Sequence, residues 1–209
     1  MTQLYRLDSS ALDVAQRFLA RPGDDPWDSG YVAPGRFAPI ITAGREFVAG
    51  PRPASGRLQP RLTPRLWGVM PPPSAHDPLR RITSVRNPNS PFWIGNLRNS
   101  EFRCLVPATS VMLWGSGTDY EGRRLKHWFV PKRGKIFAMA GVWKDEEVPG
   151  FSLLIRESAG AARKAGCTSM PAILEGEEMQ QSWLHDGWGH AEKLLNAAPD
   201  LTELPESKG

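Results

Sequence analysis

The distribution of proline constrains the fold of this chain more than any other feature of its sequence. Fourteen of the twenty prolines fall between Pro22 and Pro91. Because proline interrupts helices and inner strand ladders, this part must be rich in loops and short strands. With 209 residues, 40% of them hydrophobic and 23% charged, the chain can bury a sizeable core as one domain. We expect a single domain over residues 1–200 and a flexible tail over residues 201–209.

Short apolar runs and amphipathic runs share the chain and predict an α+β fold with no internal repeat. Helices are predicted where apolar residues recur at helical spacing, at residues 8–20 (with a cap at Ser9 or Ser10), 175–187 and 190–198. Strands are predicted in apolar runs between turn residues, at 38–43, 63–70, 102–108 and 151–157. Two further apolar runs flank "PKRG" within residues 125–143 and predict a hairpin.

Cysteine and histidine usage restricts the compartment and the chemistry. The two cysteines, Cys104 and Cys167, are too few for a disulfide framework, which favours a reducing cytoplasm. Cys104 lies among apolar neighbours and is expected in the core. No apolar run approaches the roughly 20 residues that cross a bilayer, and residues 1–30 lack a signal-peptide core, so no membrane partner is expected. The cysteines and four histidines show no metal-ligand spacing, and neither a metal nor a cofactor is expected.

Charge is distributed unevenly along the chain. Residues 36–103 contain eleven arginines, no lysine and three acidic residues, whereas residues 175–209 contain eight acidic residues and two lysines. Arginine binds phosphate through a planar fork and stacks on bases, so an arginine-rich middle favours a phosphate-backbone partner. A solvated arginine surface with scattered salt bridges explains the same composition. Charge alone does not decide between this surface and a phosphate-binding one.

Seven segments spread over nearly the whole chain resemble one protein family. They are "MTQLYRL" (1–7), "VAPGRFAPII" (32–41), "LWGVMPPP" (66–73), "TSVRNPNSPFW" (83–93), "RCLVPATSVMLW" (103–114), "KHWFVPKRGKIFAMAGVW" (126–143) and "TSMPAIL" (168–174). In this order they resemble the SRAP proteins (SOS response-associated peptidase, the abasic-site processing family). The resemblance implies a single α+β domain built on a strongly bent, mostly antiparallel sheet or barrel with flanking helices.

The resemblance also implies a chemistry that this chain has lost. SRAP proteins expose an N-terminal cysteine whose amine and thiol together trap the ring-opened sugar of an abasic site in single-stranded DNA, assisted by an asparagine, a glutamate and a histidine. Those four positions fall here on Thr2, Ser84, Leu113 and Gly166. Because leucine and glycine carry no titratable group, no intact catalytic set and no durable cross-link are expected.

Cys167 is the neighbour of the vacated histidine position. A thiol nucleophile needs a base beside it, and the family positions no longer supply one, so Cys167 is expected to be a semi-buried loop residue. Leu113 is expected to be more than half buried, close to the 165–168 loop. An N-terminal Thr2 would retain an amine able to form a Schiff base, but its hydroxyl closes a stable ring poorly.

The part of the family pattern that would face DNA is retained. Arg86 stands where the family has a phosphate-contacting arginine. The other candidate DNA-binding residues are Arg80, Arg81, Arg98, Asn87 and Asn89. Phe92 and Trp93 either stack on bases or belong to the core, and Lys126 is expected in a solvated turn.

The sequence therefore predicts a SRAP-family protein of the DNA-damage (SOS) response that binds single-stranded or abasic DNA without cross-linking it. One alternative is a protein-interaction subunit, a pseudoenzyme that acts on a protein partner. Another is an enzyme with a reassigned nucleophile, Thr2 or Cys167.

Overall fold

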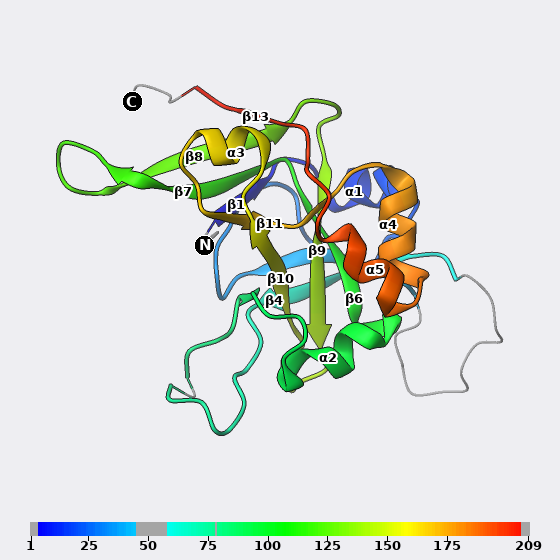
Figure 1. Cartoon of the computed structure of the whole chain (residues 1–209). Helices are drawn as coiled ribbons and strands as arrows, with labels where there is room; N and C mark the ends of the chain where they lie inside the picture. The colour runs from blue at the N-terminus through cyan, green and yellow to red at the C-terminus, as the bar shows by residue number, and fades with distance from the viewer. Residues whose placement is uncertain (1–3, 45–57, 78, 206–209) are drawn as a thin grey trace.

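The computed structural model describes residues 4–44, 58–77 and 79–205. Within these ranges the chain forms two strongly curled, mostly antiparallel sheets with helices at their edges (Figure 1). The predicted α+β architecture, a bent antiparallel sheet or barrel with flanking helices, is confirmed.

The larger sheet closes on itself. Its strand order is β11-β10-β4-β3-β6-β9-β12, with β5 paired to β10. Its strands are β3 (Phe37–Thr42), β4 (Arg61–Trp67), β5 (Ser84–Val85), β6 (Arg103–Ala108), β9 (Phe137–Lys144), β10 (Gly150–Glu157), β11 (Ser169–Pro171) and β12 (Ile173–Leu174). Because β9 pairs with both β6 and β10, strands β10, β4, β3, β6 and β9 form a continuous ring. The four strands predicted in this sheet are present.

The smaller sheet carries a long hairpin that projects from the body of the molecule (Figure 1). Its order is β13-β8-β7-β1-β2. Its strands are β1 (Leu4–Leu7), β2 (Gly30–Val32), β7 (Ser110–Thr118), β8 (Arg124–Pro131) and β13 (Leu201–Glu203). Residues 201–203, which the sequence assigns to a flexible tail, thus form an edge strand on β8.

The hairpin predicted around "PKRG" is wrong. Both of its runs are strands, β8 and β9, but they belong to different sheets. The two edges of β8 are occupied by β7 and β13, while β9 pairs with β6, β10 and β12. The "PKRG" segment therefore carries the chain from one sheet to the other, and the hairpin is formed by β7 and β8.

Helices cover the edges of the sheets. They are α1 (Ala11–Arg17), α2 (Pro91–Arg98), α3 (Gly160–Lys164), α4 (Gly176–His185) and α5 (Trp188–Leu194), with a 3-10 turn at Ser100–Phe102. The predicted serine cap of α1 is Ser10, whose hydroxyl accepts from the backbone N–H of Asp13 in a capping box. The two predicted C-terminal helices correspond to α4 and α5, and α5 begins two residues earlier than predicted.

The core lies between the inner faces of the sheets. The ring of Tyr5 on β1 packs 5.2 Å from Trp67 on β4, which stacks on Phe151 of β10. Cys104 is fully buried, as predicted. Arg103 is also fully buried, and its guanidinium donates to the main-chain carbonyls of Leu97 and Asp186. This arginine therefore ties the end of α2 to the end of α4, and burial lowers its pKa to about 10.

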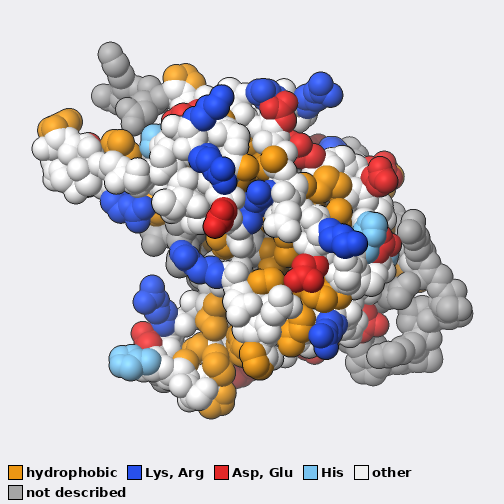
Figure 2. Space-filling view, viewed as in Figure 1, with side chains coloured by type: hydrophobic (Ala, Val, Ile, Leu, Met, Phe, Trp, Pro, Cys, Tyr) orange, Lys and Arg blue, Asp and Glu red, His pale blue; other side chains and the backbone are white. Residues whose placement is uncertain are grey.

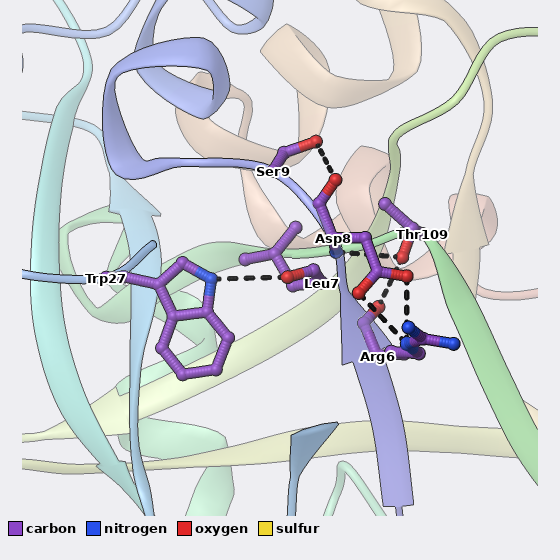
Figure 3. A network of polar contacts seen from close by, with 6 residues as sticks. All are labelled: Arg6, Leu7, Asp8, Ser9, Trp27 and Thr109. Carbon is purple, nitrogen blue, oxygen red and sulfur yellow. Dashed lines mark hydrogen bonds and ion pairs between the residues drawn. The ribbon is translucent and has the colours of Figure 1, made fainter. Parts of the chain in front are cut away.

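A polar network fixes the end of β1 (Figure 3). The Thr109 hydroxyl donates to the Arg6 carbonyl at 3.0 Å and accepts from the Asp8 backbone N–H at 3.1 Å. The Trp27 indole N–H donates to the Leu7 carbonyl at 3.3 Å, and Arg6 pairs with the Asp8 carboxylate at 2.9 Å. β1 is thus held between the 8–29 segment and the turn that joins β6 to β7.

Candidate functional site

Three of the four residues that the family resemblance assigns to catalytic positions lie in the described structure, and the fourth, Thr2, lies outside the described residues. Ser84 is half-buried on β5, opposite Leu153 of β10. Leu113 lies on β7, and Gly166 lies in the loop between α3 and β11. The side chains at these positions leave no carboxylate and no imidazole at the places where the family resemblance puts them.

The Gly166 loop is docked on β7. The Ser116 backbone N–H donates to the Gly166 carbonyl at 3.1 Å. Gly166 has a φ of 76°, and a Cβ atom there would lie 2.9 Å from the Ser116 hydroxyl oxygen. A side chain at residue 166 would therefore be strained by its backbone and crowded by its neighbour.

Leu113 is fully buried, which confirms the prediction that it is more than half buried. It lies directly across the β7–β8 pair from His127, so the two side chains share one face of the hairpin. A carboxylate at this buried position would need water or hydrogen-bond partners, whereas the apolar side chain of Leu113 needs neither.

The same face of the hairpin carries an imidazole–carboxylate pair that the sequence did not reveal. Nδ1 of His127 lies 2.6 Å from Oε1 of Glu203 on β13, and the His127 side chain is only 15% exposed. Its Nε2 atom lies over Gly115, where a Cβ atom would come within 2.6 Å. That nitrogen is buried and has no hydrogen-bond partner in the part of the chain that the structure describes.

Cys167 lies near this pair but is not bonded to its imidazole. The cysteine is 3% exposed, more buried than predicted. Burial raises the pKa of its thiol, and the negative charge of Glu203 raises it further. Nε2 of His127 lacks a hydrogen-bond partner among the described residues, so this imidazole is not bonded to the thiol. The arrangement disfavours a standing thiolate at Cys167.

The predicted DNA-binding residues are spread from the β4–β5 loop to the end of α2. Arg80 and Arg86 are exposed, whereas half-buried Arg81 donates to the Gly68 carbonyl at 3.1 Å. Arg98 is exposed in the last turn of the eight-residue helix α2. At 1.5 Å per residue this helix is roughly 12 Å long, so Arg98 lies about that far from the loop that precedes α2.

Asn87 and Asn89 form the turn before α2. The Asn87 side-chain oxygen accepts from the Asn89 backbone N–H at 3.0 Å, and the Asn89 amide donates to Glu192 of α5 at 3.2 Å. Both asparagines are exposed, but Asn89 is already paired with an acidic side chain. Arg86 therefore precedes a defined turn, while Arg98 lies at the opposite end of the following helix.

Phe92 and Trp93 do not offer open stacking faces. Trp93 is 5% exposed and packs edge-on against Phe92. The ammonium of Lys144 lies 3.4 Å from the centre of the Phe92 ring. These contacts favour packing in the protein over stacking on DNA bases for both aromatic residues.

The outer face of the smaller sheet carries aromatic and basic side chains together. We call this set the basic–aromatic strip; its members are Arg6, Tyr31, Trp114, Arg124, Lys126 and Trp128. Arg124 and Lys126 each lie 5.6 Å from the centre of the Trp114 ring. Arg6 lies 4.9 Å from the ring of Tyr31, which meets Trp128 edge-on.

Sequence analysis missed the strip because its members come from four strands. The alternation of Lys126 and Trp128 in "LKHWFV" was the available signal, since alternate residues of a strand share a face. Figure 2 shows the surface indented between the β7–β8 hairpin and the loop that joins β4 to β5, with basic side chains on both margins. Arg80 belongs to that loop, and the strip's Trp114, Arg124, Lys126 and Trp128 belong to that hairpin.

Two absences apply to the described ranges alone. Within residues 4–44, 58–77 and 79–205, no group of three His, Cys, Asp or Glu side chains is placed to hold a metal ion. Over the same residues, every helix is too short or too polar to span a membrane.

Comparison with known families identifies the class of protein. A family model described as SOS response associated peptidase (SRAP) matches residues 1–206. The chain therefore belongs to the SRAP family, as its motifs predicted. No curated protein matches its sequence.

Solved structures share the fold at low sequence identity. A crystal structure of a protein from Bacteroides thetaiotaomicron superposes with a TM-score of 0.72 and 19% identity, covering 96% of this chain and 90% of the other. A protein from Bordetella bronchiseptica gives a TM-score of 0.70 and 15% identity, covering 96% and 97%. A phage-related protein from the same organism gives 0.70 and 14%, covering 99% and 94%. At these identities the likeness concerns the fold alone.

Proposed function

We propose that this SRAP protein binds single-stranded or abasic DNA, in a cytoplasmic response to DNA damage, without forming the cross-link that the family resemblance implies. The observation that carries the proposal is the basic–aromatic strip. Single strands bind where cations meet the phosphates and aromatic rings stack on the bases, and the strip offers both on one sheet face.

Loss of cross-linking is proposed from the vacated positions. Leu113 is buried in the core and Gly166 has no side chain, so neither moves a proton. We expect incubation with abasic single-stranded DNA to leave no adduct that survives heat and detergent. A stable protein–DNA band would contradict this, and its loss in Cys167→Ser would identify a reassigned nucleophile.

DNA binding is tested by titrating a labelled single strand at several salt concentrations. Replacing Lys126 by serine or Arg86 by alanine should each lower the slope of log K against log salt by about 0.7, because each removes one phosphate contact. Trp114→Ala should cost roughly 1–3 kcal/mol of binding free energy if a base stacks on it. Lys193→Ser is the matched control, since Lys193 is an exposed lysine on α5, away from the strip.

The outcomes separate the candidate surfaces. No binding of the wild type at low salt would contradict the proposal and favour the protein-interaction alternative. Equal losses in Lys126→Ser and Lys193→Ser would show only a general effect of net charge. Retained binding in Arg86→Ala together with loss in Trp114→Ala would assign the site to the strip rather than to the β5–α2 turn.

A further inference from the structure

We infer that the surface built around α4 is a dimer interface, and that it binds a second copy of this chain related by a two-fold axis. Helices α1, α4 and α5 lie together on the side of the molecule away from the tip of the β7–β8 hairpin (Figure 1). Dimerisation through this surface does not require DNA, because its residues are separate from the basic–aromatic strip. We call the surface the α4 face; its members are Arg17, Leu19, Arg133, Glu177, Glu178 and Asp186.

Three adjoining hollows follow α4 across this face. The first lies between the end of α1 and the turn that joins β8 to β9. It shares Arg17 and Gln180 with the second hollow. The second shares Glu177 and Gln181 with the third, which extends to α5. The hollows therefore form one continuous depression, and the second separates the first from the third.

The first end of the depression presents unpaired positive charge. Arg17 and Arg133 line it, and both are exposed and without an ion-pair partner in the described part of the chain. The carboxylates beside them are already engaged. Glu175 accepts from the Asp200 backbone N–H at 2.8 Å, and Asp200 pairs with Lys132 at 2.7 Å. Two guanidinium groups are thus free to bind carboxylates of another molecule.

The opposite end of the depression is acidic. Glu177 and Glu178 are exposed, and neither is ion-paired among the residues that the structure describes. Asp186 adds a third carboxylate, 3.9 Å from the imidazole of His190. The described side chains that line this hollow include neither lysine nor arginine. Its carboxylates therefore have the charge that the guanidinium groups of the first end require.

An exposed leucine lies between the two charged ends. Leu19 lines the second hollow and is 62% exposed. Its φ of 51° places it in the left-handed region, which leucine rarely adopts. A strained backbone that presents an apolar side chain to solvent is a feature of binding surfaces. An apolar centre with a charged rim is also the usual anatomy of a protein–protein interface.

The order of basic end, apolar centre and acidic end selects the partner. Nucleic acid does not fit this order, because the acidic end repels phosphate. A matching surface needs the same features in the reverse order. The α4 face of a second copy has that order once it is turned about a two-fold axis through the apolar centre. Each basic end then meets an acidic end, and the two Leu19 side chains lie near the axis.

Sedimentation velocity of the protein without DNA tests this interface. At low salt, a species with twice the mass of one chain should form as the protein concentration rises. High salt should weaken it, because the Debye length falls to about 3 Å at 1 M and exposed charges are screened. A monomer at every concentration in low salt would overturn the inference and leave the proposed DNA binding untouched.

Leu19→Gly separates a function in the interface from one in folding. Because glycine adopts positive φ without strain, this variant should unfold at or above the wild-type temperature. It should nevertheless dimerise at least about tenfold more weakly, since the apolar centre is lost. Leu12→Ala is the matched control, because Leu12 is 57% exposed on α1 and lies outside the three hollows. Unchanged dimerisation of Leu19→Gly, or equal weakening in Leu12→Ala, would exclude the α4 face.

Charge reversal tests the two-fold pairing of the ends. The double variants Arg17→Glu/Arg133→Glu and Glu177→Lys/Glu178→Lys should each dimerise at least about tenfold more weakly alone, because like charges then face each other. Mixed in equal amounts they should form a dimer, since every end then meets the opposite charge. Arg98→Glu reverses an exposed charge outside the α4 face and should dimerise like the wild type. Wild-type dimerisation of either double variant alone, or no mixed dimer from two folded variants, would contradict the two-fold arrangement.

Discussion

Replacing Leu113 by glutamate introduces the carboxylate that the family resemblance implies, at a position where this chain has a core side chain. Leu113 is fully buried, so losing its side chain removes about 2 kcal/mol of hydrophobic burial. The new carboxyl group avoids burying a charge by remaining protonated. From an ordinary pKa of about 4.3, staying neutral at pH 7 costs roughly 3.7 kcal/mol. A hydrogen bond to Nε2 of His127 offsets about 1 kcal/mol, so the variant should lose about 5 kcal/mol of unfolding free energy.

The pH dependence is the sharper test of this reasoning. Burial raises the pKa of the new carboxyl group in the folded state, so the variant is most stable below the unfolded pKa and loses stability as pH rises toward the folded pKa. Between pH 7 and pH 5 the cost of staying neutral falls to about 1 kcal/mol, a recovery of about 3 kcal/mol. Leu113→Gln is the uncharged control and should show no such recovery.

Urea unfolding followed by tryptophan fluorescence at pH 5 and pH 7 measures both variants. Each free energy is compared with that of the wild type at the same pH, which removes the titration of groups common to all three proteins. If Leu113→Glu unfolds at the wild-type urea concentration at pH 7, the site is an open, solvated cleft and the reasoning fails. The same conclusion follows if the glutamate and glutamine variants differ equally at both pH values.

Iodoacetamide at pH 7.5 should modify neither Cys104 nor Cys167 in the native protein, because both are buried and the pKa of Cys167 is raised. Both cysteines should react after unfolding. Rapid labelling of Cys167 in the native protein, detected by mass spectrometry, would reveal an accessible thiolate. Arg103→Ala should lower the unfolding free energy by about 3 kcal/mol, because the buried Leu97 carbonyl and the part-buried Asp186 carbonyl lose their donor. The exposed Arg98→Ala should stay within about 0.5 kcal/mol of wild type. Equal effects would exclude a special role for the buried arginine. Gly166→His should cost about 1–2 kcal/mol through its left-handed backbone, and an unchanged thermal midpoint would show that the loop relaxes freely.

The sequence by itself determined the local elements and the losses at the family positions. The capping box of α1 and the strands β3, β4, β6 and β10 depend on short-range patterns, so residues 8–20 and four apolar runs sufficed to predict them. The seven motifs identified the family, and their departures showed that Leu113 and Gly166 carry no proton-transfer group. These features depend on which residue occupies a position, and no long-range contact is needed to recognise them.

Only the tertiary structure decided which strands pair and which side chains meet. β8 and β9 are separated by a short segment that resembles a hairpin turn, yet they lie in different sheets because other strands occupy their edges. Arg103 looked like one more arginine of a basic surface, but its carbonyl partners come from α2 and from the end of α4. His127 and Glu203 are 76 residues apart, and they meet because residues 201–203 add a strand to β8. Strand pairing over such separations leaves no local signature, since propensity and periodicity fix an element but not its neighbour.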